Sequence, residues 1–276
     1  MATDGGVTTI DGTFTSISVG NNFACGVRTD RTIACWGDNS LGQASAPTGT
    51  FSSVSANWYH ACGLTTDGTV TCWGDSAYYY NLSSPPTDTY ASISAGYTNT
   101  CGVKIDGGVT CWGVDWAGES IPPAGTFMSL CGGAFFTCGL RSDGTIVCWG
   151  GNGGGNTALT PPSGTFTFMS AGDDYPCAVR NDGAVLCWGG DGVSSYGAAP
   201  AASFNSVGVS TFEVCGVKTD GTLGCWGDGA LAQPTPPTGA FTAVSLGDTF
   251  ACALRTDGTV LCWDLNLPPP WNGCCY

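Results

Sequence analysis

The chain has 276 residues, of which 21 are acidic and 7 are basic, so its formal net charge is −14. This charge argues against nucleic-acid binding, which needs clustered lysine and arginine, and against attachment to anionic lipid. No apolar run is long enough to span a bilayer, so we expect no membrane insertion. The first residues, "MATDGGVTTI", lack the regions of a secretory signal, so we expect a processed chain or a module of a longer protein.

The composition favours strands over helices. The chain contains 44 glycines and 15 prolines, many short β-branched runs, and very little glutamate or lysine. Glycine and proline destabilise helix interiors, whereas β-branched residues are favourable in strands. We therefore predict an all-β fold.

One motif recurs seven times along the chain. It pairs two cysteines ten positions apart: Cys25–Cys35, Cys62–Cys72, Cys101–Cys111, Cys138–Cys148, Cys177–Cys187, Cys215–Cys225 and Cys252–Cys262. A tryptophan follows each second cysteine, and an aromatic residue stands eleven positions before each first one: Phe14, Phe51, Tyr90, Phe127, Phe166, Phe204 and Phe241. First cysteines recur every 37 to 39 residues, a period typical of solenoids and propellers.

Each repeat predicts three strands in chain order. The first follows the aromatic residue, as in "FTSISVG" from residue 14. The second runs from the first cysteine to a turn, and the third runs from the turn to Trp-Gly. A variable segment containing proline comes next, and there we expect a short outer strand, because proline suits a sheet edge.

The turn between the two cysteines fixes their register. If Ser142-Asp143-Gly144 is a three-residue hairpin loop, Cys138 faces Cys148 directly. Opposed cysteines on antiparallel strands lie within disulfide reach, so we predict one bridge per repeat, each contributing about 2 kcal/mol. Seven bridges place the protein outside the cytosol. The first repeat has Arg31 where the others have Gly, so its turn should be strained or different.

Strand alternation makes both faces of each predicted sheet apolar. Valine or leucine shares one face with the cysteines, and the tryptophans lie on the other. Sheets that are apolar on both faces are covered by neighbours on both sides. We therefore predict a single seven-bladed β-propeller over residues 1–276, in which each disulfide face packs on the tryptophan face of an adjacent blade. The repeats start near residues 14, 51, 90, 127, 166, 204 and 241, and residues 265–276 form a C-terminal tail.

The stretch "VSLGDTFACALRTDGTVLCWD", which ends at residue 264, resembles the repeat of the regulator of chromosome condensation family. The cysteine-rich form is most similar to secreted members such as crinkly-type receptor ectodomains, and the propeller-type β-lactamase inhibitor proteins share the fold without these cysteines. The family's usual Gly-Gln-Leu-Gly after Trp-Gly is mostly absent from this chain, and "LGQ" at 41–43 and "LAQ" at 231–233 are its remnants. The resemblance implies an extracellular propeller. The founding member's action on a small GTPase and on chromatin does not transfer to an acidic, disulfide-paired chain.

The remaining reactive residues do not form a catalytic or metal site. The cysteine pairs are dispersed and the chain has a single histidine, His60, which favours disulfides over zinc and argues against a catalytic triad. We expect no enzyme activity, metal or cofactor. Cys131 stands where other repeats have Ser or Gly, which favours a buried structural role. Seventeen cysteines leave at least one unpaired within the chain, so Cys131 can bond to the tail, and Cys274 or Cys275 can link two copies.

Two features concern the surface. Asn81 opens the sequon "NLS" and predicts a glycoprotein. Basic residues stand three positions after six of the first cysteines, where we expect them to pair with the turn aspartates: Arg28, Lys104, Arg141, Arg180, Lys218 and Arg255. With Arg31, they place all positive charge at the hairpin tips on one face of the disc.

The opposite face should carry the loops that vary most between repeats. We predict that it is a binding face with aromatic and acidic side chains: Trp58, Tyr59, Tyr78, Tyr79, Tyr97, Trp116, Phe135, Asp173, Asp174, Phe212 and Asp248. Aromatics are typical binding anchors, and the unpaired acids favour a partner with a basic patch. The same aromatics could instead cap the blade ends. We therefore predict an extracellular module that binds a protein; the alternative is a structural or adhesive component, either a lectin that binds glycan or a filament subunit.

Overall fold

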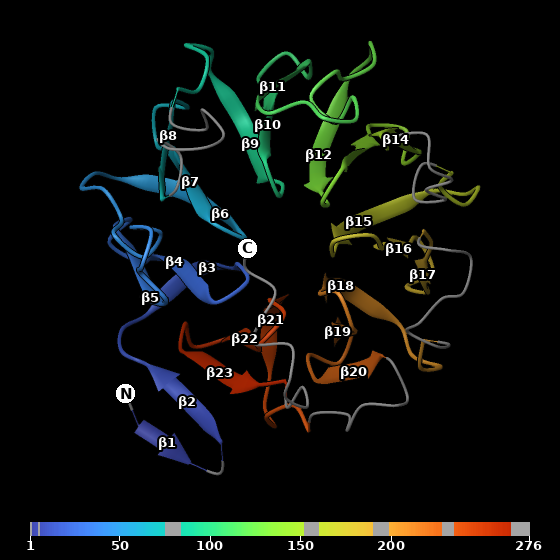
Figure 1. The fold of residues 1–276 in the computed structure, drawn as a ribbon. Helices are drawn as coiled ribbons and strands as arrows, with labels where there is room; N and C mark the ends of the chain where they lie inside the picture. Colours follow the sequence, from blue (N-terminus) through green and yellow to red (C-terminus); the bar gives the residue numbers. More distant parts are fainter. Residues whose placement is uncertain are drawn as a thin grey trace.

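A computed structural model describes residues 2–4, 6–74, 84–151, 160–189, 199–227 and 235–265. The described residues form seven antiparallel sheets, which stand as blades around a central axis (Figure 1). The predicted seven-bladed propeller is therefore confirmed.

Each blade contains three consecutive strands. The inner strands, next to the axis, are β3 (Phe14–Val19), β6 (Phe51–Asn57), β9 (Tyr90–Ala95), β12 (Phe127–Gly132), β15 (Phe166–Ala171), β18 (Phe204–Val209) and β21 (Phe241–Leu246). The middle strands are β4 (Phe23–Arg28), β7 (His60–Thr65), β10 (Asn99–Lys104), β13 (Phe136–Arg141), β16 (Pro176–Arg180), β19 (Glu213–Lys218) and β22 (Phe250–Arg255). The outer strands are β5 (Ile33–Gly37), β8 (Val70–Gly74), β11 (Val109–Gly113), β14 (Ile146–Gly150), β17 (Val185–Cys187), β20 (Leu223–Gly227) and β23 (Val260–Asp264). We number the blades 1 to 7 in this order.

The seven predicted disulfides all form between the middle and outer strands of one blade. Cys138 is the direct register partner of Cys148, and their Cα atoms are 4.0 Å apart. The same spacing recurs in the other six pairs. It is the close approach typical of a non-hydrogen-bonded pair on antiparallel strands. The ten-residue spacing in the sequence is therefore explained by the hairpin register.

Blades pack in the predicted way, disulfide face against tryptophan face. In blade 1, Cys25 and Val27 pack with Phe51, Val54 and Trp73 of blade 2. The ring closes through the same contact, since Cys252 and Leu254 of blade 7 pack with Phe14, Val19 and Trp36 of blade 1. Each blade thus buries apolar surface on two neighbours, which accounts for strands that are apolar on both faces.

The aromatic residue that opens each repeat also lies inside its own blade. In blade 4, the Phe127 ring covers Gly139, where an added Cβ would lie 2.5 Å from the ring. The ring centroids of Phe127 and Trp149 are 5.8 Å apart. The guanidinium carbon of Arg141 lies 5.6 Å from the Phe127 ring centroid, a cation–π arrangement.

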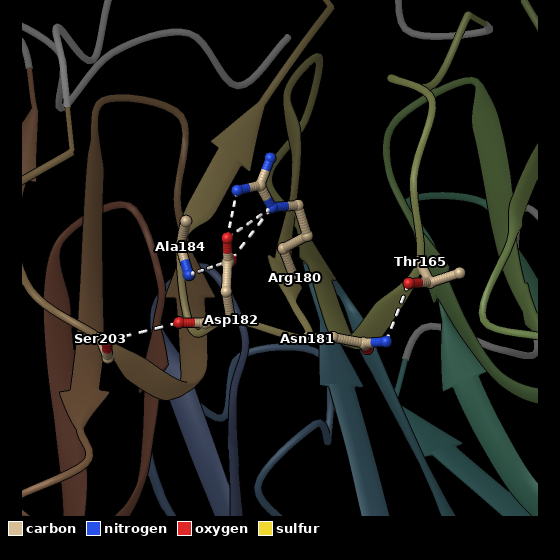
Figure 2. Close-up of polar contacts among 6 residues, drawn as sticks. All are labelled: Thr165, Arg180, Asn181, Asp182, Ala184 and Ser203. Carbon is tan, nitrogen blue, oxygen red and sulfur yellow. Dashed lines mark hydrogen bonds and ion pairs between the residues drawn. The ribbon is translucent and has the colours of Figure 1, made fainter.

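The basic residues do lie at the hairpin tips, but the expected pairing with the turn aspartates is largely wrong. Only at blade 5 does a tip ion pair appear among the described residues, between Arg180 and Asp182 (Figure 2). Arg28, Arg141 and Arg255 instead stack over the opening aromatic of their own blade. The turn aspartates are held by local hydrogen bonds: Asp182, for example, accepts from the backbone N–H of Ala184 at 3.1 Å. At blade 5, Asp182 keeps this turn bond while it pairs with Arg180.

The expected outer strand after Trp-Gly is absent from the two connections that the structure describes completely, residues 38–50 and 114–126. A fourth strand occurs at blade 7, and it comes from the start of the chain. Strand β2 (Val7–Ile10) pairs with β23, and β1 (Ala2–Asp4) pairs with β2. The first residues of the chain therefore add strands to the sheet of the last blade and help to close the ring (Figure 1).

A row of four serine hydrogen bonds joins the inner strands of blade 7 and blades 1 to 4 near the axis. The Ser55 hydroxyl accepts from the backbone N–H of Ala95 in the next blade at 2.9 Å, and Ser18, Ser94 and Ser245 make equivalent bonds. Cys131 occupies the same position in blade 4. It is buried, forms no disulfide within the described residues, and burial raises the pKa of its thiol to about 12. The expected role of Cys131 as a small buried residue is therefore supported.

The turn of blade 1 allows a direct test of backbone strain. Arg31 has φ of 69°, whereas the glycines at the six equivalent turns have φ between 83° and 87°. The turn keeps its usual form and the arginine bears the strain. We predict that Arg31→Gly raises the free energy of unfolding by about 1 kcal/mol, measured by denaturant titration. Arg31→Ala, which removes the side chain but keeps the strained Cβ, should give no gain; an equal gain would show that strain is not the cause.

Candidate functional site

Two sets of loops emerge on one face of the disc, as predicted from the strand directions. We call this the loop face; it contains the connections between inner and middle strands and the segments that follow the outer strands. Backbone hydrogen bonds tie the two sets together: Asp38 N–H donates to Asn22 C=O at 2.9 Å, and Val114 N–H donates to Thr98 C=O at 2.9 Å. The hairpin turns form the opposite face, which we call the tip face.

Five of the predicted aromatic residues meet on the loop face of blades 2 to 4. Ring centroids are 5.0 Å apart for Trp58 and Tyr97, 5.8 Å for Tyr59 and Tyr97, 6.3 Å for Tyr97 and Phe135, and 6.1 Å for Phe135 and Trp116. We call these five residues the aromatic ridge. Four of them are half-buried against one another, whereas Trp116 is 55% exposed.

Two of the other predicted binding residues lie on blades that do not contribute to the ridge. Phe212 is half-buried on blade 6, and Asp174 is exposed on blade 5. Tyr78, Tyr79 and Asn81 lie outside the described residues, as do Cys274 and Cys275.

A buried carboxylate that we did not predict holds Trp116 in place. The Glu119 side chain is fully buried and accepts hydrogen bonds from the backbone N–H groups of Trp116 at 3.0 Å and Ala117 at 2.7 Å. Its backbone C=O accepts from the Trp149 indole N–H at 2.9 Å. Gln43 plays the same part in blade 1, where its C=O accepts from the Trp73 indole N–H. "AGE" at 117–119 is thus the counterpart of "LGQ" at 41–43, and this alignment could have revealed it.

Asp173 and Asp248 are brought together by a threonine between them. The Thr211 hydroxyl lies 3.1 Å from Asp173 Oδ2 and 2.8 Å from Asp248 Oδ1. The indole N–H of Trp58 donates to Asp173 Oδ1 at 2.9 Å. Because β6 and β15 stand on opposite sides of the axis, this bond reaches across the centre of the ring (Figure 1).

The pKa values of both carboxyl groups are raised. Burial, followed by the negative charge of Asp248, raises the pKa of Asp173 to about 6. Burial also raises the pKa of Asp248. No basic side chain contributes to either shift, so the pair carries a local excess of negative charge.

Beneath these residues lies a cavity along the propeller axis. Its volume is about 520 Å³, and the inner strands of all seven blades contribute to its lining. Trp58, Asp173, Thr211 and Asp248 line it at the loop face, and we call these four residues the channel mouth. The sequence prediction placed Trp58, Asp173 and Asp248 on one face, but it did not include Thr211 and did not bring these residues together across the axis.

His60 has a structural environment. It is fully buried, its Nε2 lies 2.8 Å from the Thr100 hydroxyl, and burial lowers its pKa to about 4. The imidazole is therefore neutral at physiological pH. Among the described residues, no three His, Cys, Asp or Glu side chains are grouped so that they could hold a metal ion. The described part of the chain also contains no helix that could cross a membrane.

Comparisons with known proteins agree with this architecture. The family model for the regulator of chromosome condensation (RCC1) repeat matches residues 14–43, 51–79 and 241–263. No curated protein matches the sequence. The chain is similar to the CRINKLY WD40 ectodomain of the Arabidopsis thaliana receptor kinase ACR4, with 26% identity, a TM-score of 0.77, and coverage of 94% of this chain and 97% of that one.

Two further solved structures are similar. The ectodomain of the Physcomitrella patens receptor kinase CR4 has 28% identity and a TM-score of 0.75, with 93% of this chain and 75% of that chain covered. Human WBSCR16 has 13% identity and a TM-score of 0.70, with 92% and 88% covered, a likeness of fold alone. The predicted resemblance to RCC1-type repeats and crinkly-type ectodomains is confirmed.

The contact between Trp58 and Asp173 makes the carboxyl charge observable. Because the indole N–H donates to Asp173, its NMR chemical shift should follow ionisation of that group, with a midpoint near the pKa of about 6. We predict that Asp248→Asn lowers this midpoint, since it removes a like charge, and that Asp174→Asn lowers it less. A midpoint near the ordinary aspartate value of about 4 in the unmodified protein would contradict the described site.

Proposed function

We propose that this chain, a disulfide-paired propeller of RCC1-type repeats, is an extracellular recognition module that binds a protein partner through its loop face. The similarity to two receptor ectodomains supports an extracellular binding role. Seven disulfides are typical of an oxidising compartment and would not persist in the cytosol.

The aromatic ridge is the observation that carries this proposal. Trp116 is 55% exposed, whereas repeat tryptophans such as Trp73 and Trp149 are buried. Trp116 is also held in a fixed position, because the buried Glu119 carboxylate fastens the backbone on which it stands. A rigid, exposed aromatic loses little conformational entropy on binding, which is the character of an interface anchor.

The two faces of the disc differ in a way that favours the loop face. At the tip face, the seven turns repeat one local structure, with the aspartate side chain accepting from the backbone two residues later. At the loop face, equivalent positions carry unlike residues, among them Trp58, Asp173 and Thr211. Function is disproportionately carried by variable loops on a rigid scaffold.

The charge distribution indicates the kind of partner. The loop face carries Asp173 and Asp248 at the channel mouth, and the chain as a whole has a net charge of −14. A partner with a basic patch would be attracted by this field and would bind faster at low salt. We propose binding rather than catalysis, since His60 is buried and neutral.

The test compares one exposed apolar side chain from each face. With the partner isolated from the native extracellular fluid, we expect Trp116→Ala to weaken binding at least tenfold, about 1.4 kcal/mol or more. Ile105→Ala, at a tip-face turn where the side chain is 71% exposed, should leave binding unchanged. Both variants should keep the melting temperature of the unmodified protein.

The opposite result, with loss on Ile105→Ala and none on Trp116→Ala, would show that the wrong face has been chosen. Binding to a glycan array with no protein partner would instead favour a lectin, which is the alternative function.

A further inference from the structure

We infer that the channel mouth binds the guanidinium group of an arginine side chain presented by the partner protein. This inference rests on the proposed function, because it assigns a specific chemistry to the loop face. It concerns Trp58, Asp173, Thr211 and Asp248, which come from blades 2, 5, 6 and 7.

The Thr211 hydroxyl cannot serve both carboxylates at the mouth. It lies within hydrogen-bond distance of both Asp173 Oδ2 and Asp248 Oδ1, yet a hydroxyl has a single proton to donate. When both aspartates are ionised, one of these two hydroxyl contacts lacks a proton, and the other donor to Asp248 Oδ1 is the Thr211 backbone N–H at the longer distance of 3.3 Å. A ligand that brings N–H donors to this point removes the deficit, and a neutral or anionic ligand cannot do so as well.

The position of the carboxylates suits a planar cation with several donors. Both lie within reach of one hydroxyl, so they are close enough to be bridged by one guanidinium. Its five N–H groups form a rigid fork that matches carboxylate geometry, whereas an ammonium is a point charge with a strong hydration shell. Trp58 approaches Asp173 from the opposite side of the axis, so its indole lies beside the carboxylates.

A bound metal ion fits this site less well. Divalent cations with oxygen ligands usually take six or more of them, commonly from several carboxylates. The described residues contain no group of three or more His, Cys, Asp or Glu side chains that could hold an ion. Two carboxylates beside an indole are a better match for an organic cation.

The site is also accessible to a side chain from outside. Asp173 and Asp248 are partly exposed, and they border the 520 Å³ cavity rather than solid protein. The Tyr97 ring packs against Trp58 at 5.0 Å, so the mouth is continuous with the aromatic ridge. An arginine at the mouth would therefore sit beside apolar residues of the same partner that contact the ridge.

The experiment uses N-acetyl-L-argininamide as the probe and the intact protein, with the indole N–H resonance of Trp58 as the readout. Loss of that resonance in Trp58→Phe assigns it. We expect saturable binding with Kd on the order of 1 mM at pH 7.5, since the probe is a small, flexible molecule. N-acetyl-L-citrullinamide, which has nearly the same shape and no charge, should bind at least tenfold more weakly, and N-acetyl-L-lysinamide several-fold more weakly.

Two matched variants locate the site. Asp248→Asn should weaken binding of the arginine probe at least tenfold, whereas Asp174→Asn, which removes the same charge from the same face, should change it less than threefold. Equal binding of the citrulline and arginine probes, equal binding of the lysine probe, or equal effects of the two variants would each overturn the inference.

Failure of this experiment can be distinguished from failure of the test of the proposed function. A protein that needs Trp116 for its partner but shows no preference for the arginine probe would keep the proposed function and lose this inference. A protein that binds the probe as expected but shows no dependence on Trp116 would keep an arginine-binding channel mouth and lose the aromatic ridge as the contact with the partner.

Discussion

The structure depends on one contact: a disulfide between directly opposed cysteines, packed on the tryptophan face of the next blade. The bridge joins positions whose Cα atoms are 4.0 Å apart, so it can form only in one hairpin register. That register aims the cysteines and their apolar neighbours, such as Val27, at the next blade. Seven repetitions close into a ring, because the last disulfide face meets the first tryptophan face. The covalent bonds stay within blades, and apolar burial holds the blades together.

This arrangement leaves the loop face free to vary. The loops connect strands that are already fixed by bridges, serine hydrogen bonds and neighbouring blades, so their side chains carry little of the folding free energy. Trp116, Asp173 and Asp248 can therefore differ from their counterparts in other blades without loss of the fold. Burial, followed by the negative charge of Asp248, raises the pKa of Asp173 to about 6. Carboxyl groups with shifted pKa values are frequent at functional sites.

The sequence was sufficient to predict what is local and periodic. Cysteine spacing and the Asp-Gly turn predicted the register, the bridges, the two apolar faces, the strain at Arg31 and the face on which the loops emerge. It was not sufficient for contacts between distant repeats. Nothing in the spacing of Trp58 and Asp173, 115 positions apart, indicates a hydrogen bond across the axis. The stacking of Arg141 on Phe127 and the return of β2 to β23 were missed for the same reason, since each depends on how completed strands lie in space.

The most direct test of the account is hydrogen–deuterium exchange of the protein with and without its isolated partner. The central claim is that a rigid propeller presents one variable face for recognition. We expect slower exchange in the complex at residues 57–60, 96–99 and 115–119 of the loop face and at 172–174 and 210–212 around the channel mouth. The turns at residues 29–31, 142–144 and 181–183 should exchange as in the free protein. Slower exchange confined to those turns would place recognition on the tip face and contradict the account.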